Sequence, residues 1–190
     1  NSGDPIRFEN NQTAATPWSG IQFNASAQGS VSWSDFTRAS LAINVTRSSP
    51  AISNNTILQA YAGVYLNRSS SRVADNLIDG KKLGALGIIV QSSNATLERN
   101  RINGTNFGIR SFEGGNLTLT DNTITNTSGS GFAMALYLDN LTSASLRGNT
   151  IQRVLGRDAG PGGTGTAAVG ILINDASDVM LAGNTIQEIR

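Results

Sequence analysis

Residues 87–102 read GIIVQSSNATLERNRI, and this stretch contains both halves of the pattern from which the fold can be predicted. The first half, residues 87–90, is a small residue followed by an apolar, a variable and an apolar position. The second half, residues 97–102, is an apolar residue, two variable positions, an asparagine, a variable position and an isoleucine. Alternation of apolar and variable residues over so few positions is typical of a short β-strand with one buried face.

Both halves recur along the chain with a fixed internal spacing, which is the signature of a repeat protein. The first half returns seven times, each copy beginning with one small residue: Gly20, Ala42, Gly63, Gly87, Gly108, Ala135 and Gly170. The second half returns with its asparagine at Asn55, Asn76, Asn100, Asn122, Asn149 and Asn184. The first copy keeps the spacing but carries Ser34 in place of the asparagine. So short a unit cannot bury its inner face alone, so each copy must stack on the next.

The repeat predicts an all-β fold, a parallel β-solenoid of about seven coils with three short strands in each. No stretch shows the helical period of 3.6 residues, so helices are not expected. The recurring asparagines are predicted to form an Asn ladder inside one bend, where each side-chain amide bonds the same amide in the coils above and below. Asparagine also tolerates the left-handed backbone region that a sharp bend requires, and we expect the ladder residues to adopt it.

A leucine-rich repeat is the alternative architecture, because its consensus also ends in leucines followed by asparagine. Residues 117–124 match that ending. The leucine expected three residues upstream is Gly114, however, and in the last copy the same place is Ala176. We therefore exclude this alternative.

The amino-acid composition excludes several classes of site and partner. The chain has 190 residues, a net charge of +1, only 14% charged residues, and neither histidine nor cysteine. Disulfides, thiolate metal sites and imidazole bases are therefore excluded, which leaves chemistry with carboxylate, lysine, arginine or tyrosine groups, or none. We expect no metal and no cofactor, and we assign no catalytic residue. The balanced charge speaks against nucleic acid as a partner, and no apolar run is long enough to span a membrane. A polar chain rich in asparagine, serine and threonine predicts a secreted or cell-surface location.

The coils resemble the right-handed parallel β-helix of the pectate-lyase-like superfamily, in its Gly-Ile…Asn-x-Ile repeat class, over about residues 18–190. Residues 5–8 and 18–21 also resemble the early coils of bacterial surface β-helix proteins. The resemblance implies that the strand after the small residue forms the first sheet, the Leu/Val strand the second, and Asn-x-Ile the third. The chain stops at Arg190, directly after a third-sheet strand, so we expect residues 1–190 to be a single β-helix domain and a segment of a longer solenoid.

The resemblance also implies a location for a site, because polysaccharide-active relatives use the outer face of the first sheet. The residues predicted to point outward there are Gln22, Asn44, Tyr65, Ile89, Arg110, Tyr137 and Leu172. Aromatic rings can stack on sugars, and polar groups can bond sugar hydroxyls. The candidate glycan-binding residues are therefore Tyr65, Arg110, Phe112, Tyr137 and Asp139.

Three functions remain open. The first is a non-catalytic secreted or cell-surface module, structural or adhesive, that binds polysaccharide along the first sheet. The second is a polysaccharide lyase, hydrolase or epimerase with Arg110 and Asp139 in its site, although the expected carboxylate sets are missing. The third is a structural subunit that self-associates end to end into a filament or sheath.

Overall fold

The computed structural model describes residues 4–9, 17–80, 85–129, 131–156, 165 and 167–190. These residues form strands and turns, with no helix among them. Every pair of neighbouring strands in the three sheets is parallel, and each strand pairs with its equivalents one coil earlier and one coil later. The predicted all-β parallel solenoid is confirmed.

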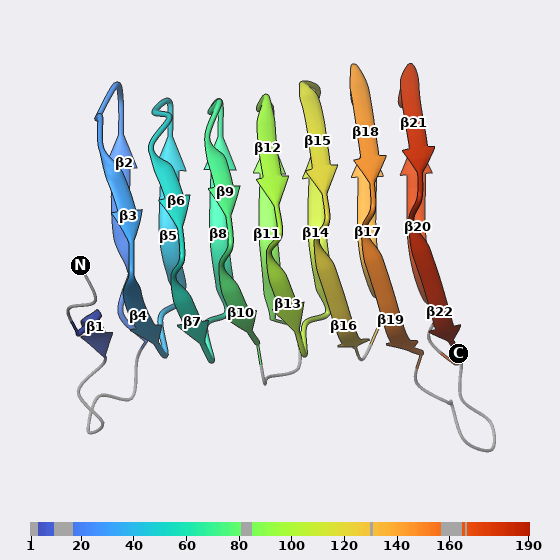
Figure 1. Ribbon diagram of the computed structural model, residues 1–190, viewed down its shortest axis with the longest axis horizontal. Coiled ribbons are helices and arrows are strands. Elements are labelled where there is room, and N and C mark those ends of the chain that lie inside the picture. The colour runs from blue at the N-terminus through green and yellow to red at the C-terminus, as the bar shows by residue number, and fades with distance from the viewer. Residues whose placement is uncertain (1–3, 10–16, 81–84, 130, 157–164, 166) are drawn as a thin grey trace.

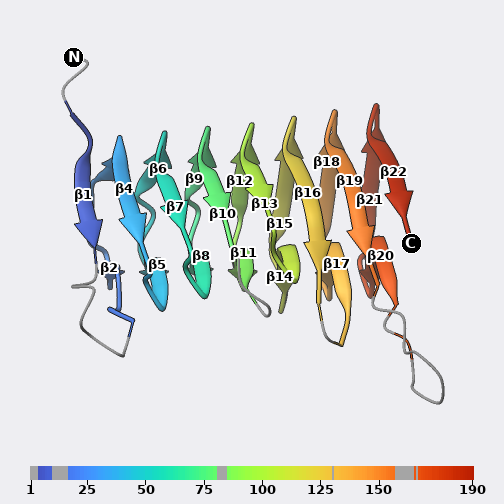
Figure 2. The ribbon, with the colours of Figure 1, turned by 90° about the horizontal axis from the view of Figure 1, so that it is seen from below.

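The strands follow one another in a fixed cycle through three sheets (Figures 1 and 2). The first sheet contains β2 (Ile21–Asn24), β5 (Leu41–Thr46), β8 (Ala62–Asn67), β11 (Leu86–Gln91), β14 (Phe107–Phe112), β17 (Ala133–Asp139) and β20 (Ala168–Asn174). The second contains β3 (Ser30–Ser32), β6 (Ala51–Ser53), β9 (Arg72–Ala74), β12 (Ala95–Glu98), β15 (Asn116–Thr120), β18 (Ser143–Arg147) and β21 (Asp178–Ala182). The third contains β1 (Ile6–Glu9), β4 (Ser34–Thr37), β7 (Thr56–Leu58), β10 (Leu77–Asp79), β13 (Arg101–Asn103), β16 (Thr123–Ser128), β19 (Thr150–Leu155) and β22 (Thr185–Ile189).

The core consists of apolar rows that run along the solenoid, one residue from each coil. In the third sheet, the pairing register aligns Ile57, Ile78, Ile102, Ile124 and Ile151, all 2% exposed or less. Burying an isoleucine side chain contributes about 1.5–3 kcal/mol, so stacking identical residues in register favours both folding and the correct register. At the N-terminal end, the rings of Phe8 and Trp18 stack with that of Phe36, at centroid distances of 5.0 to 6.2 Å.

The Asn ladder is present, and its hydrogen bonds are regular. Each ladder asparagine donates from Nδ2 to Oδ1 of the next one at 2.9–3.0 Å, from Asn55 through Asn184. The backbone N–H of the donor residue bonds the same oxygen, at 2.9–3.2 Å. Ser34 takes the first place, where its backbone N–H donates to Asn55 Oδ1 at 3.1 Å. Each interior amide is thereby saturated, as a buried polar group must be.

The expectation that the ladder residues themselves adopt the left-handed region is wrong. The residue directly before each ladder position does so instead, with φ between 49° and 63°. These residues are Trp33, Asn54, Asp75, Arg99, Asp121, Gly148 and Gly183. The physical reason is that the left-handed residue turns the chain with its side chain outside, which leaves the next side chain pointing into the core.

Candidate functional site

The strand register places the seven outward residues of the first sheet in one row, from Gln22 to Leu172. A second outward row lies at the ends of the same strands and includes Asn67, Gln91, Phe112 and Asp139. Most of these side chains are half-buried, so they are packed against one another along the sheet. The outer face of the first sheet is therefore an ordered surface along the length of the solenoid.

Three aromatic rings surround the guanidinium group of Arg110. Its Cζ lies 4.8 Å from the ring centroid of Phe112, 5.5 Å from that of Tyr137 and 5.7 Å from that of Phe107. Phe107 and Tyr137 also contact each other, at a centroid distance of 6.3 Å. Cation–π contacts of this kind fix the orientation of the guanidinium. The Nε atom is enclosed and has no hydrogen-bond partner, so the terminal nitrogens are the donors left for a ligand.

A chain of hydrogen bonds joins Tyr65 to Glu113 across three neighbouring coils. The hydroxyl of Tyr65 donates to Gln91 Oε1, and Gln91 Nε2 donates to Glu113 Oε2. Ser92 Oγ lies 3.5 Å from the same carboxylate oxygen. Burial raises the pKa of Tyr65, and the negative charge of Glu113 raises it further. The Tyr65 hydroxyl therefore keeps its proton, and its hydrogen bond to Gln91, to a higher pH than an exposed tyrosine would.

The candidate residues fall into two groups. Arg110, Phe112 and Tyr137 form one cluster, while Tyr65 lies on β8, two strands away from Arg110 or about 10 Å. Asp139 ends β17 and is half-buried, and it forms no ion pair with Arg110 in the described part of the chain. The five residues therefore share one face, and among them Arg110 contacts Phe112 and Tyr137.

Phe107 and Glu113 belong to this site and were missed from the sequence. Phe107 is two residues before the inward Ile109, so regular alternation predicts that it points inward. The strand is irregular at Gly108, which is left out of the pairing register, and Phe107 turns outward to Arg110. Glu113 lies one residue past β14, beyond the strand positions that the pattern defines.

Aromatic residues are distributed unevenly over the three outer faces. The outer face of the first sheet and the turn residues that lead into its strands hold Tyr61, Tyr65, Phe107, Phe112, Phe132 and Tyr137, of which Tyr61 and Phe132 are 61% and 55% exposed. Along the described strands of the second and third sheets, the outward positions contain no aromatic residue. Trp33, 68% exposed, precedes β4 at the bend between those two sheets.

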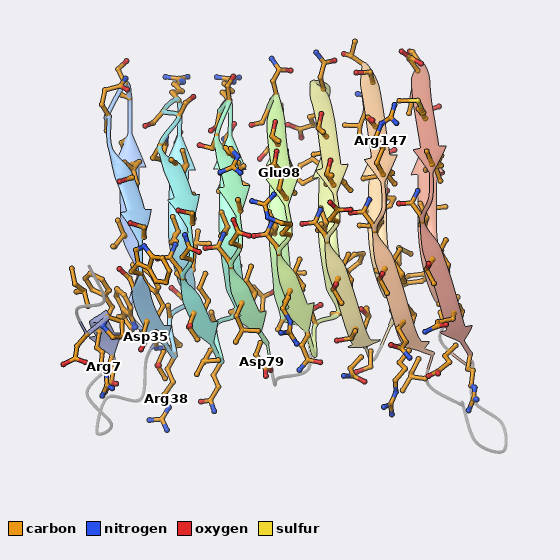
Figure 3. All side chains as sticks on the ribbon, viewed as in Figure 1. Arg7, Asp35, Arg38, Asp79, Glu98 and Arg147 are labelled. Atoms are coloured by element: carbon orange, nitrogen blue, oxygen red, sulfur yellow. The ribbon has the colours of Figure 1, made fainter. Side chains whose placement is uncertain are left out.

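The other two faces carry charged and small polar groups instead (Figure 3). Glu98 and Arg147 lie on the second sheet, and Asp35 and Asp79 on the third. Arg72 pairs with Glu98, and Arg99 Nε and Nη2 bond the two carboxylate oxygens of Asp75, at 2.7 and 2.8 Å. The hydrogen bonds from Arg99 lower the pKa of Asp75. Shallow hollows over these sheets are lined by threonine, serine, aspartate and leucine rather than by rings.

Two features are absent from the described residues. No group of three or more aspartate or glutamate side chains is placed to hold a metal ion there. In the same part of the chain, no helix is long and apolar enough to cross a membrane.

The geometry defines a β-solenoid with one aromatic outer face. The family model of the right-handed β-helix region matches residues 1–102 and, in a second overlapping match, residues 41–190. The chain belongs to this family, and the resemblance to right-handed parallel β-helices is confirmed. Neither a search of curated proteins nor a search of solved structures found a match.

Proposed function

We propose that the chain is a non-catalytic module of a secreted or cell-surface protein and that it binds polysaccharide along the outer face of the first sheet. The observation that carries this proposal is the gathering of six aromatic residues on that face and its leading edge. A general preference of aromatic residues for strands would place them on all three faces alike. Six of the seven outward aromatic residues in the described part of the chain lie on this face or its edge, Trp33 being the exception, and this concentration supports a binding role.

The arrangement fits a flexible chain of sugar rings. Tyr65 and Tyr137 are three strands apart, about 14 Å along the solenoid. Sugar rings present apolar faces that can stack on the aromatic residues, while their hydroxyls can accept from Arg110 and exchange hydrogen bonds with Gln91 and Asn67. A flat strip of this kind supports binding to an extended polymer more than to a small molecule enclosed in a pocket.

Cleavage of the bound polymer is the second candidate. Glu113 and Asp139 lie at the ends of neighbouring strands, and glycoside hydrolysis uses two carboxylates. Glu113 is already bonded by Gln91, with Ser92 close by, which supports a positioning role. Release of reducing ends by the wild type and its loss in Glu113→Gln would favour cleavage over simple binding.

The test is affinity electrophoresis of the chain in gels that contain neutral or acidic polysaccharides. We expect at least one polymer to retard the wild type, and Tyr137→Ala to weaken that binding about tenfold or more. Trp33→Ala is the matched control, because it removes an exposed ring away from the first sheet and should leave retardation unchanged. Urea unfolding of each variant checks that the fold is kept. Absence of retardation by every polymer, or a loss caused by Trp33→Ala alone, would contradict the proposal.

A further inference from the structure

The turn between the first and second sheets presents one exposed or half-buried side chain from each coil. We call this column the charged corner; its residues are Ala25, Arg47, Arg68, Ser92, Glu113, Asn140 and Asp175. All of them have positive φ, and backbone hydrogen bonds from Arg47 to Asn67 and from Arg68 to Gln91 keep successive turns in register. The side chains are therefore spaced by about one strand separation, 4.8 Å, along the solenoid.

The charges of this corner are sorted by sign. Arg47 and Arg68 are positive on one side of Ser92, whereas Glu113 and Asp175 are negative on the other. Asp139, next to Asn140, adds a further negative charge to the second side. None of these five charged groups forms an ion pair with another residue in the described part of the chain. Glu113 accepts a hydrogen bond from the neutral amide of Gln91, with Ser92 Oγ 3.5 Å away, so its negative charge, like the charges of the other four, is not balanced by an opposite charge among the described residues.

We propose that the charged corner pairs with the same corner of a second copy of this chain, running antiparallel. A two-fold axis through Ser92 places Arg68 opposite Glu113 and Arg47 opposite Asn140 and Asp139. Each contact occurs twice because a two-fold interface is isologous. The net charge of +1 gives no general repulsion between copies that would oppose this approach.

The other two corners lack this complementarity. At the bend before the Asn ladder, Asp75 and Asp121 flank Arg99, so an antiparallel copy centred there would bring like charges together. Arg99 is moreover already bonded to Asp75. At the bend between the third and first sheets, Arg153 and Glu188 lie in neighbouring coils and form an ion pair, with Arg153 Nε 3.9 Å from Glu188 Oε2. Sorted and unpaired charge is found at one corner among the described residues.

Antiparallel pairing would have a consequence for ligand binding, which rests on the proposed function. The two-fold axis lies in the contact plane, perpendicular to both solenoids, so the first sheets of the two copies face the same side. Phe112 and Tyr137 of each copy then belong to one continuous aromatic surface, which is wider than either copy offers alone. The pairing itself does not depend on any glycan.

The test is sedimentation velocity of the 190-residue chain over a range of concentrations, at about 0.02 M and about 0.5 M salt. Exposed ion pairs are individually weak, so we expect a dimer at low salt that dissociates at high salt. Arg68→Glu and Glu113→Arg should each weaken dimerisation about tenfold or more. An equimolar mixture of the two variants should dimerise again, because each reversed charge then meets its opposite.

Arg101→Glu is the matched control, since it makes the same change in charge on the exposed face of the third sheet. It should dimerise like the wild type. A chain that stays monomeric at low salt, a dimer that resists high salt, or a failure of the mixture to restore dimers would overturn the proposal. These outcomes concern dimerisation alone, and glycan binding is measured separately by the gel assay of the wild type and Tyr137→Ala.

Discussion

The interior asparagine is the residue on which the stacking of coils depends most directly. Asn122, 1% exposed, donates from Nδ2 to Leu97 O and to Asn149 Oδ1, at 2.8 and 3.0 Å. Its own Oδ1 accepts from the backbone and side chain of Asn100, both at 3.0 Å. Aspartate offers no donors and serine too short a reach, so asparagine alone among small polar residues bonds both neighbouring coils.

Asn122→Ala should lower the free energy of unfolding by about 3 kcal/mol, because it leaves two buried donors of Asn100 without an acceptor. Chemical denaturation with urea measures this loss. Asn24→Ala, at the exposed end of β2, is the control and should change stability by less than about 0.5 kcal/mol. A loss at Asn122 no larger than that of the control would show that the ladder contributes little.

The ladder positions could be predicted because one residue type returns at one register in six copies. The left-handed residue before each ladder position could not, since it is Asn54, Asp75, Arg99 or Asp121 in successive coils and has no common type. These side chains lie outside the core, so core packing does not restrict which residue type stands there. The sequence pattern therefore predicted the buried asparagines correctly. It assigned the left-handed backbone conformation to these asparagines, whereas the preceding residue adopts it.

At the scale of the strand, the small residue near the start of each first-sheet strand controls how closely the coils approach. A Cβ added at Gly108 would lie 2.6 Å from Ala135 O and 2.6 Å from Ile124 Cγ2. The irregularity at this residue also turns Phe107 outward, as its contact with Arg110 shows. One small residue thus serves both the core and the candidate site.

Gly108→Ala should lower the free energy of unfolding by about 2 kcal/mol, because the added methyl group must displace backbone and a packed isoleucine. Gly131→Ala is the control, since nothing lies within 4 Å of a Cβ added there. Urea unfolding compares the two variants, and near-ultraviolet circular dichroism, to which Tyr137 contributes, reports whether the packing of the aromatic side chains changes. Equal stability of Gly108→Ala and wild type would mean that neighbouring coils move apart at little cost.

At the scale of the whole molecule, the residues of the core repeat from coil to coil, whereas those of the outer faces do not. Apolar residues repeat in every coil because each coil must match its neighbour, and this repetition made the fold predictable. Outward residues are free of that constraint, so no repeat indicates the cluster of Arg110 with its three rings. The rows of the candidate site could be predicted from strand alternation, whereas Phe107 and the Tyr65–Gln91–Glu113 chain depend on local irregularity and on contacts between coils.

A solenoid whose coils contact only their neighbours should not be equally stable along its length. In the second sheet, Leu119 is fully buried while its equivalent Leu181 is 49% exposed, and in the third sheet Ile124 is fully buried while Ile186 is 47% exposed. Amide hydrogen exchange of the 190-residue chain should therefore be slowest in β11 to β16 and about 100-fold faster or more in β21 and β22. Ladder bonds between coils make the central coils open together, so Asn122→Ala should accelerate exchange most in β12 and β15 and least in β3 and β6. Uniform protection in the wild type, or uniform acceleration in the variant, would instead show that all coils unfold as one cooperative unit and that the nearest-neighbour description fails.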